Sequence, residues 1–386
     1  MNISDSIRYA GVNDHEIDLF EGQFEVPLGM AYNSYVILDE KIAVMDSVDA
    51  NFGEEWLSNI KEILAGKNPD YLVVQHMEMD HSSNIKKFID IYPESKIVAS
   101  KMAFMMMKSM FGTDFADKQI VVGEGSTLEL GKHTLSFIAA PNVHWPEVIM
   151  TYDSYDKVLF SADGFGKFGA NDVIDPEGWA CEARRYYFGI VGKFGANVQT
   201  VLKKVAGLEI NVIAPLHGPV LNENLKYYLD IYNTWSSYGV ESEGVCISYT
   251  SVYGHTKQVA EKLAEILKSK GCPKVALNDL AREDIYECVE DAFRYGKLVL
   301  ATTTYNGGVF PKMKEFIEHL TERNYQNRTV AFIENGSWAP MANKGMASLF
   351  EQSKNLKILE TKVSVKISMT TENISALETL ADEILK

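Results

Sequence analysis

Cysteine is scarce in this sequence of 386 residues, and its four cysteines, at positions 181, 246, 272 and 288, form no C-x-x-C pair. This spacing excludes a zinc ribbon, a cysteine-ligated iron–sulfur cluster and a disulfide framework. Positive charge is also in short supply, because 37 lysines and arginines face 53 aspartates and glutamates, which gives a net charge of −16. Such a charge repels a phosphate backbone, so no nucleic acid partner is expected.

Long apolar runs are missing as well. No stretch reaches the roughly 18–20 apolar residues that a membrane helix needs, and the first residues lack the basic-then-apolar pattern of an export signal. We therefore expect a soluble, cytoplasmic protein with no membrane association. The length exceeds the roughly 250–300 residues at which a single hydrophobic core stops growing, which predicts more than one domain.

Two different patterns of β-rich runs and helical periodicity divide the chain. In residues 1–240, short β-rich runs at 33–46, 71–75, 134–140, 148–152 and 157–161 are interspersed with helical periodicity at 54–65 and 179–194. In residues 241–386, runs at 245–249, 274–277, 297–301, 328–334 and 362–367 alternate with helical stretches such as 256–269 and 374–385. The first pattern predicts mixed α and β layers with antiparallel pairing. The second predicts a doubly wound α/β domain with a five-stranded parallel sheet, and the polar segment 234–244 marks the boundary.

A cluster of potential metal ligands follows the predicted strand 71–75. It comprises His76, Glu78, Asp80 and His81 in the run His76-Met-Glu-Met-Asp-His81. Three further candidates each follow an apolar run in a turn-rich segment, and they are His144, Asp163 and His217. Singly, such residues are often surface histidines, turn aspartates or helix caps. Together they contain four of the eight histidines in the chain, and the combined set predicts a metal site.

The order of these residues resembles the metallo-β-lactamase superfamily, whose signature is H-x-H-x-D-H followed by a later His, Asp and His. This sequence departs from the signature at Glu78, which stands where zinc hydrolases of the superfamily usually have a second histidine. A carboxylate in place of an imidazole adds negative charge and an oxygen donor, which favours iron or manganese over zinc.

A hydroxyl-rich loop, residues 250–256, lies between the predicted strand 245–249 and a helix. It matches neither G-x-G-x-x-G nor G-x-x-x-x-G-K-[ST], so the dinucleotide and P-loop interpretations fail. Ser251-Val-Tyr-Gly-His-Thr256 resembles the flavodoxin phosphate loop S/T-x-x-G-x-T, which implies FMN; the alternative is that Ser251 and Thr256 only cap the helix. Two later loops follow the third and fourth strands at the same sheet edge. The candidate FMN-binding residues are Thr250, Ser251, Val252, Tyr253, Gly254, His255, Thr256, Thr303, Thr304, Tyr305, Asn306, Gly307, Gly308, Asn335, Gly336, Ser337 and Trp338.

A β-lactamase-like domain with this substitution, followed by a flavodoxin-like domain, resembles the flavodiiron proteins, also called A-type flavoproteins. The resemblance implies an N-terminal αββα metallo-β-lactamase-like domain and a C-terminal doubly wound flavodoxin-like domain. It also implies an oxidoreductase with FMN and two irons that reduces O2 to water, nitric oxide to nitrous oxide, or both. Because no C-x-x-C rubredoxin module is present, we expect the minimal two-domain class, a separate rubredoxin or similar electron donor, and a head-to-tail homodimer or possible tetramer.

Carried over by position, the resemblance places His76, Glu78 and His144 on one iron, Asp80 and His217 on the other, and Asp163 between them. His81 ligates the second metal in some relatives. Tyr186 and Tyr187 are candidates for lining the catalytic pocket, although paired aromatic residues in a helix are more often core. Two other functions stay open: a zinc hydrolase of the superfamily with an accessory flavodoxin domain, and a non-enzymatic flavin electron carrier or sensor whose first domain is silent.

Overall fold

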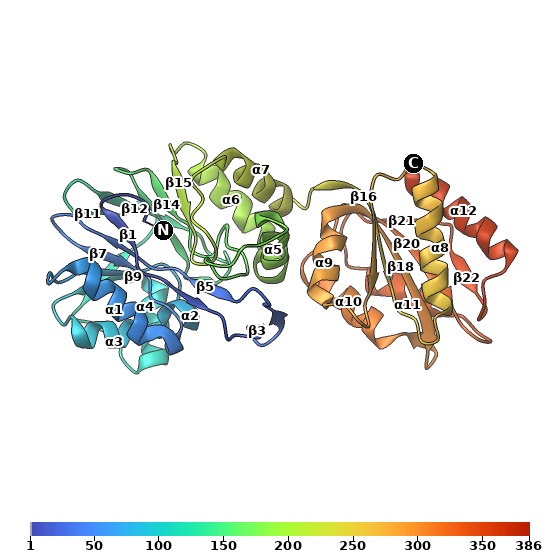
Figure 1. Ribbon diagram of the computed structural model, residues 1–386, viewed down its shortest axis with the longest axis horizontal. Coiled ribbons are helices and arrows are strands. Elements are labelled where there is room, and N and C mark those ends of the chain that lie inside the picture. The colour runs from blue at the N-terminus through green and yellow to red at the C-terminus, as the bar shows by residue number, and fades with distance from the viewer. Residues whose placement is uncertain (1) are drawn as a thin grey trace. The chain divides into compact units, whose positions relative to one another are not determined.

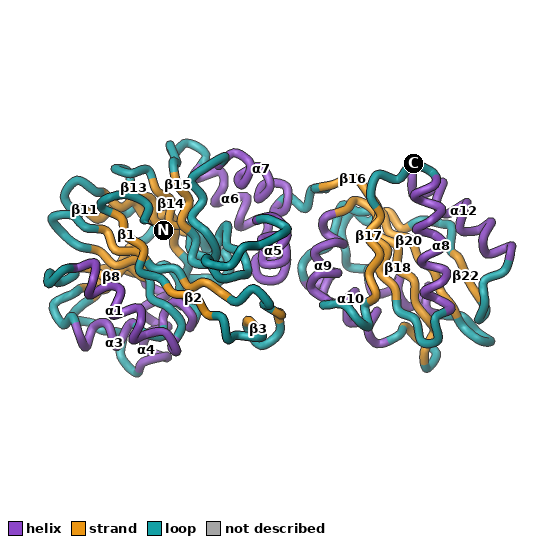
Figure 2. The backbone as a smooth tube through the Cα atoms, viewed as in Figure 1, coloured by secondary structure: helices purple, strands orange, loops and turns teal. Residues whose placement is uncertain are grey.

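The computed structural model describes residues 2–386, which form two compact units, the first ending at Asn233 and the second beginning at Thr234 (Figures 1 and 2). None of the helices in this part of the chain combines the length and the apolar composition needed to cross a membrane.

Two sheets make up the centre of the first unit. The first has the strand order β1 (Ile7–Tyr9), β6 (Tyr35–Ile37), β7 (Ala43–Met45), β8 (Tyr71–Val74), β9 (Lys96–Ser100) and β10 (Gln119–Val122). The second has the order β11 (Thr127–Glu129), β12 (Thr134–Ala139), β13 (Ile149–Asp153), β14 (Val158–Phe160) and β15 (Val212–Ala214). Two small ribbons pair β2 (Val12–Asp14) with β5 (Met30–Tyr32), and β3 (Leu19–Phe20) with β4 (Phe24–Glu25).

The hydrophobic core of this unit lies between the two sheets. One buried cluster joins Tyr35, Met45 and Val98 of the first sheet to Phe137 and Phe160 of the second. Helices cover the outer faces: α1 (Gly53–Leu64), α3 (Ile85–Ile91) and α4 (Lys101–Phe111) lie over the first sheet, and α6 (Gly195–Val205) lies over the second (Figure 1). The order helix, sheet, sheet, helix confirms the expected αββα architecture.

The element predictions for this unit hold with one exception. The expected hairpin in 33–46 is β6 paired antiparallel with β7, and the strands expected at 71–75, 134–140, 148–152 and 157–161 are β8, β12, β13 and β14. The helix expected over 179–194 is interrupted, because α5 (Trp179–Tyr186) continues as a π-helical turn, Tyr187–Val191, and a 3-10 turn, Gly192–Phe194. Gly189 and Gly192 favour the interruption, because glycine has a low helix propensity. A Cβ at Gly189 would also lie 2.7 Å from the Phe24 ring.

The second unit is a doubly wound sheet. Its parallel strands have the order β17 (Val275–Asp279), β16 (Ser242–Tyr249), β18 (Tyr295–Tyr305), β20 (Thr329–Asn335) and β22 (Val363–Val365), which confirms the five expected strands. Two short strands were not predicted from the sequence. They are β21 (Lys357–Ile358), which pairs with the start of β20, and β19 (Gly308–Val309), which turns back on β18. Helices α8 (His255–Ser269) and α12 (Thr371–Leu385) pack together on one face, and α9 (Ile285–Arg294) and α10 (Pro311–Glu322) lie on the other (Figure 1).

Candidate di-metal centre

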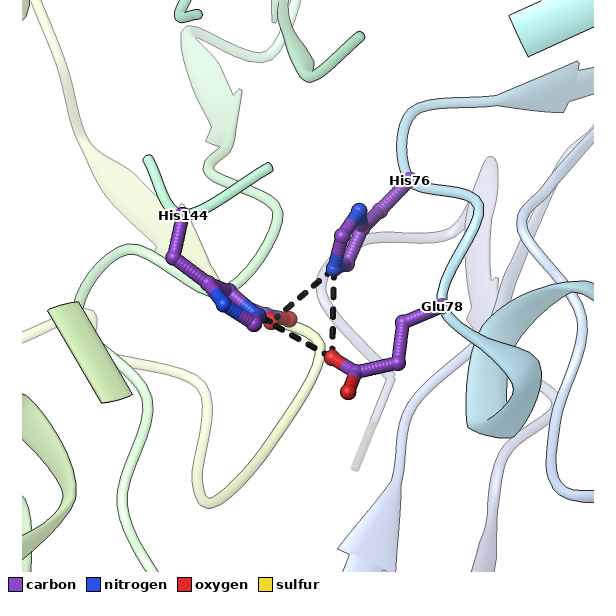
Figure 3. Close-up of side chains that lie close together, drawn as sticks. His76, Glu78 and His144 are labelled. Atoms are coloured by element: carbon purple, nitrogen blue, oxygen red, sulfur yellow. Dashed lines mark hydrogen bonds and ion pairs between the residues drawn. The ribbon is translucent and has the colours of Figure 1, made fainter. Parts of the chain in front are cut away.

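Four side chains from three segments of the first unit form one group of donor atoms. His76 and Glu78 follow β8, His144 lies between β12 and β13, and Asp163 follows β14. His144 Nε2 lies 3.0 Å from both Glu78 Oε2 and Asp163 Oδ2, and His76 Nε2 lies 3.3 Å and 3.4 Å from the same two oxygens. Figure 3 shows His76, Glu78 and His144 pointing toward one another. The four donors therefore converge on one point.

A second group lies on the other side of Asp163. Nε2 of His81 and Nε2 of His217 are 3.0 Å apart, and Asp80 Oδ2 lies 3.3 Å from the first and 3.2 Å from the second. Asp80 and His81 lie on the short helix α2 (Met79–Ser82), and His217 follows β15. His81 is thus part of the group, which the sequence alone left open.

Asp163 is shared by the two groups. Its Oδ2 faces the nitrogens of His76 and His144, whereas its Oδ1 lies 3.4 Å from His81 Nε2 and 3.9 Å from His217 Nε2. All seven predicted ligand residues are thereby brought together, with Asp163 in the middle. The geometry is that of two adjacent ligand sets with a carboxylate between them.

Residues that the sequence analysis missed hold these ligands in place. Asp46, at the end of β7, is fully buried, and its carboxylate accepts hydrogen bonds from the backbone N–H and the side-chain amide of Gln75, at 2.7 and 2.9 Å. Ser47 donates from both its backbone N–H and its hydroxyl to the carbonyl of His81. Both contacts come from the residues that follow β7, the strand next to β8, so they fix the two ends of the His76–His81 segment.

The outer nitrogens of two histidines are also fixed. His76 Nδ1 lies 2.8 Å from Glu147 Oε1, which also accepts from the backbone N–H of Met77 at 2.8 Å. His217 Nδ1 donates to the backbone carbonyl of Ala31 at 2.8 Å. Such partners set the ring orientation and tautomer of metal-binding histidines. Glu147 follows His144 by three residues but belongs to no recognisable motif, so the sequence gave no reason to select it.

The carboxylates create a strongly negative potential at the centre. Burial alone would lower the pKa of His144, but the carboxylates of Asp163 and Glu78 outweigh it and raise that pKa to about 9. The pKa of His76 is likewise raised against the effect of burial, chiefly by Asp163. The pKa of Asp163 is lowered in spite of its complete burial, because His76, His144 and His81 surround it. The site therefore favours positive charge.

The donor set fits two metal ions. Asp80 and Asp163 are buried, and their oxygens accept no hydrogen bond from any residue in 2–386. Buried carboxylates in proteins are paired or bind metals. Bonds of about 2.0–2.2 Å to a metal place neighbouring donors roughly 3.0–3.5 Å apart, which is the spacing seen here. Mixed imidazole and carboxylate donors suit iron.

A hollow of about 350 Å³ opens beside the donors. Glu78 and Asp80 line it, together with Ile17, Phe20, Glu21, Tyr32, Asp49, Met79 and Trp145. Trp145 also contacts the His76 ring edge-on, with a centroid distance of 5.4 Å. None of these other lining residues was predicted from the sequence as a site residue. Met79 and Trp145 are chain neighbours of predicted ligands, whereas the others come from distant segments.

The two tyrosine candidates differ in position. The Tyr186 ring centroid lies 5.6 Å from that of His217, and its buried hydroxyl has no hydrogen-bond partner among the residues described. Burial raises the pKa of Tyr186, and the nearby charges of Asp163, Glu78 and Asp80 raise it further. Tyr187 instead packs against the rings of Phe188 and Tyr232. Tyr186 therefore borders the centre, whereas Tyr187 contacts the aromatic core.

In the second unit, the three predicted loops meet at the carboxyl edge of the sheet. Nine of the candidate FMN-binding residues line one shallow hollow together with Ile367, and they are Ser251, Val252, Tyr253, His255, Thr256, Thr303, Asn335, Gly336 and Ser337. Tyr253 and Trp338 are 89% and 87% exposed, so neither ring contributes to the core of the unit. Ser251 Oγ accepts from the backbone N–H of Gly254, which leaves its hydroxyl proton available for a ligand. The arrangement fits a phosphate-bearing flat ligand.

Other candidates of this set have different positions. Thr250 is buried beneath the loop, where its hydroxyl bonds that of Thr302. The Thr304 hydroxyl accepts from the backbone N–H groups of Met341 and Ala342, at the start of α11 (Ala342–Leu349). Tyr305, Asn306, Gly307 and Gly308 form the tight turn between β18 and β19, in which Asn306 and Gly307 both have positive φ. The sequence predicted a loop here without the second strand of the hairpin.

Comparison with known proteins gives matches for both units. Residues 30–218 match the family model of the ODP family beta lactamase, and residues 246–364 match that of a flavodoxin domain. A putative diflavin flavoprotein A 2 from Synechocystis is 32% identical over 279 residues, which cover 71% of this chain and 48% of that protein. An anaerobic nitric oxide reductase flavorubredoxin from Escherichia coli is 28% identical over 373 residues, covering 92% of this chain and 77% of that protein.

Two solved structures are similar over nearly the whole chain. The rubredoxin oxygen:oxidoreductase of Desulfovibrio gigas is 26% identical, with a TM-score of 0.92 and coverage of 100% of this chain and 97% of that one. The flavodiiron protein of Giardia intestinalis is 25% identical, with a TM-score of 0.90 and coverage of 99% and 94%. The chain spans about half the length of the diflavin relatives that it matches.

The fold and the site together define a protein in which a β-lactamase-like unit with a two-metal ligand set is joined to a flavodoxin-like unit. With matches to both family models and to two solved structures over nearly the whole length, the chain has the two-unit organisation of the flavodiiron proteins and is similar to them throughout.

Proposed function

We propose that this protein is an oxidoreductase that reduces O2 to water, nitric oxide to nitrous oxide, or both. In this proposal a di-iron centre lies in the first unit, FMN binds at the loop hollow of the second, and a rubredoxin-like protein supplies the electrons. The observation that carries the proposal is the seven-residue ligand set with Glu78 in its first group. The names of two similar proteins, a nitric oxide reductase and a rubredoxin oxygen:oxidoreductase, support the same chemistry.

We assign the ligands from the distances. His76, Glu78 and His144 would hold one iron, and Asp80, His81 and His217 would hold the other. Asp163 faces both groups and would contribute to both. The irons, when bound, supply a centre that can change its oxidation state next to a small substrate. Bound FMN supplies single electrons. The side chains of the protein orient the ligands, limit water and supply a hydrogen-bond donor.

The hollow beside the ligands suits a small uncharged substrate. Phe20, Met79 and Trp145 contribute apolar lining, which limits the amount of water beside Glu78 and Asp80. Glu147 and the carbonyl of Ala31 keep the His76 and His217 rings oriented. The Tyr186 hydroxyl, buried beside His217 with a raised pKa, stays protonated and is available as a hydrogen-bond donor at the edge of the centre.

Metal content and gas consumption test the proposal together. Protein purified anaerobically from iron-replete cells should contain about two irons and one FMN per chain, and with reduced rubredoxin it should consume O2, NO or both. Stoichiometric zinc with little iron would favour the hydrolase alternative. A flavin-containing protein that consumes neither gas would favour the carrier alternative. A matched variant, Glu78→His, restores the zinc-hydrolase signature and should raise the ratio of bound zinc to bound iron.

A further inference from the structure

Two neighbouring hollows of the first unit share three of their lining residues. The inner hollow is the one beside the metal ligands, and the outer hollow has a volume of about 340 Å³. Ile17, Tyr32 and Asp49 line both. The remaining lining residues of the outer hollow are Asp14, Glu16, Asn51 and Phe52. We call the two hollows together the acidic groove.

Carboxylates dominate the acidic groove. Asp14, Glu16 and Asp49 line its outer part, and Glu21, Glu78 and Asp80 line its inner part. Among the residues described, no lysine or arginine lines either part. A cleft lined by charges of one sign focuses the electric field and concentrates ions of the opposite sign. O2 and NO carry no net charge, so these carboxylates do not attract them electrostatically. The same carboxylates do attract a divalent cation.

Tyr32 and Asp49 connect the two parts of the groove, because both residues line both hollows. Asp14 lines the outer hollow, Asp49 lies on the lining that the two hollows share, and Asp80 lines the inner hollow. The carboxylates thus form a series from the outer hollow to the metal ligands.

The inner end of this series is an unsatisfied acceptor. Asp80 is only 8% exposed, lines the inner hollow, and has no hydrogen-bond partner for either carboxylate oxygen in residues 2–386. In the outer part, backbone N–H groups hold Oδ1 of Asp14 and Oδ1 of Asp49, and no residue described donates to Oδ2 of either. Asp14 and Asp49 are therefore held in place with one oxygen of each available to a cation, and Asp80 offers both of its oxygens.

We propose that the acidic groove is the route by which ferrous ions reach the metal centre, and that Asp49 transfers them from the outer hollow to the inner one. The inference rests on the proposed di-iron function. It concerns the loading of the centre, and it predicts an effect on the rate of iron uptake with no effect on the final iron content.

The test is the rate at which iron-free protein takes up Fe²⁺ under anaerobic conditions. Asp49→Asn keeps the size of the side chain and an oxygen that can accept from the Asn51 N–H, but it removes the charge. At low ionic strength this variant should load about threefold to tenfold more slowly than the wild type, because cleft charges raise association rates by 10-fold or more. The final iron content should be unchanged. Glu16→Gln, at an exposed position, should slow loading in the same direction.

A matched control separates local from overall charge. Asp90→Asn removes one negative charge from an exposed residue of α3, outside the groove, and should load at the wild-type rate. Added salt should shrink the effect of Asp49→Asn, because salt screens the interaction. Asn51→Asp, which adds a carboxylate to the outer hollow, should accelerate loading.

Wild-type loading of Asp49→Asn at low salt would overturn the inference, as would equal slowing by Asp90→Asn. A lower final iron content in Asp49→Asn would show that Asp49 supports the centre itself, which also contradicts a role limited to transfer. A wild-type chain that takes up no iron would instead refute the proposed di-iron function, so the two failures can be distinguished.

Discussion

Replacing Glu147 with glutamine should weaken one half of the metal centre and spare the other. Glu147 Oε1 contacts His76 Nδ1 and accepts from the Met77 N–H, both at 2.8 Å. Glutamine has nearly the same shape and keeps an acceptor oxygen, but it lacks the charge that raises the basicity of the His76 ring. It also places an NH2 group where Oε2 is now buried without a partner among the residues described.

The magnitude follows from the position of the contact. Loss of the partner of a metal-binding histidine costs about 10–100-fold in metal affinity, which corresponds to about 1.4–2.7 kcal/mol. We expect this loss at the group of His76, Glu78 and His144. The other group should keep its affinity, because the partner of His217 is the backbone carbonyl of Ala31, which the substitution does not alter.

An anaerobic Fe²⁺ titration of the iron-free variant, followed by spectroscopy that resolves the two iron environments, measures both affinities. Glu147→Gln should show one tight and one weak site, whereas the exposed control Glu94→Gln should match the wild type. Equal weakening of both sites, or none at either, would refute the argument that the contact acts through one ring.

Three further predictions concern other parts of the molecule. Asp163→Asn should reduce iron at both positions, because its two oxygens face different ligand groups, whereas Glu78→Ala should chiefly affect one; iron content and magnetic coupling measure this. Replacing Ser251 and Thr256 with alanine removes two hydroxyl donors, each worth about 1.5–3 kcal/mol toward a charged group. The affinity for FMN should therefore fall by about two to four orders of magnitude, while iron stays bound. Loss of iron together with FMN in the same sample would contradict the independence of the two units. His133 stabilises the fold in a pH-dependent way. Burial lowers the pKa of His133, but Asp153, Asp156 and Asp39 outweigh burial and raise that pKa. The contribution of His133 to the free energy of unfolding is therefore complete below about pH 6.5 and is lost as the pH rises through the raised pKa. In urea denaturation, the stability difference between wild type and His133→Asn should therefore be larger at pH 6 than at pH 9, and a difference that grows with pH would contradict this sign.

Much of the metal centre could be predicted because its ligands carry their own signal. His76, Glu78, Asp80 and His81 lie within six residues directly after a strand, and a strand end is where a rigid scaffold presents side chains. The alternation of strands and helices after residue 241 likewise predicted the parallel sheet, because apolar periodicity reflects which face of each element is buried.

The rest depended on contacts between distant segments. Glu147, Asp46 and the carbonyl of Ala31 act on the ligands through single hydrogen bonds, and nothing in their local sequence distinguishes them from other residues at strand ends. The turn at Asn306 and Gly307 was missed for a different reason. Its Asn-Gly pair is typical of a tight hairpin, but the strand that follows, β19, has only two residues, too few for a recognisable pattern.

The origin of the ligands has a consequence for how the first unit holds together. The segment His76–His81 extends from the first sheet, whereas His144, Asp163 and His217 extend from the second. Ions bound to both sets act as a crosslink between the two halves of the sandwich, so the unit and its metals form one thermodynamic system. Binding to the folded state alone adds about 2.7 kcal/mol of stability when the free ligand is at 100 times its Kd. A cell that runs short of iron would therefore hold a chain that unfolds and is degraded more readily, and the supply of metal would set the abundance of the protein as well as its activity.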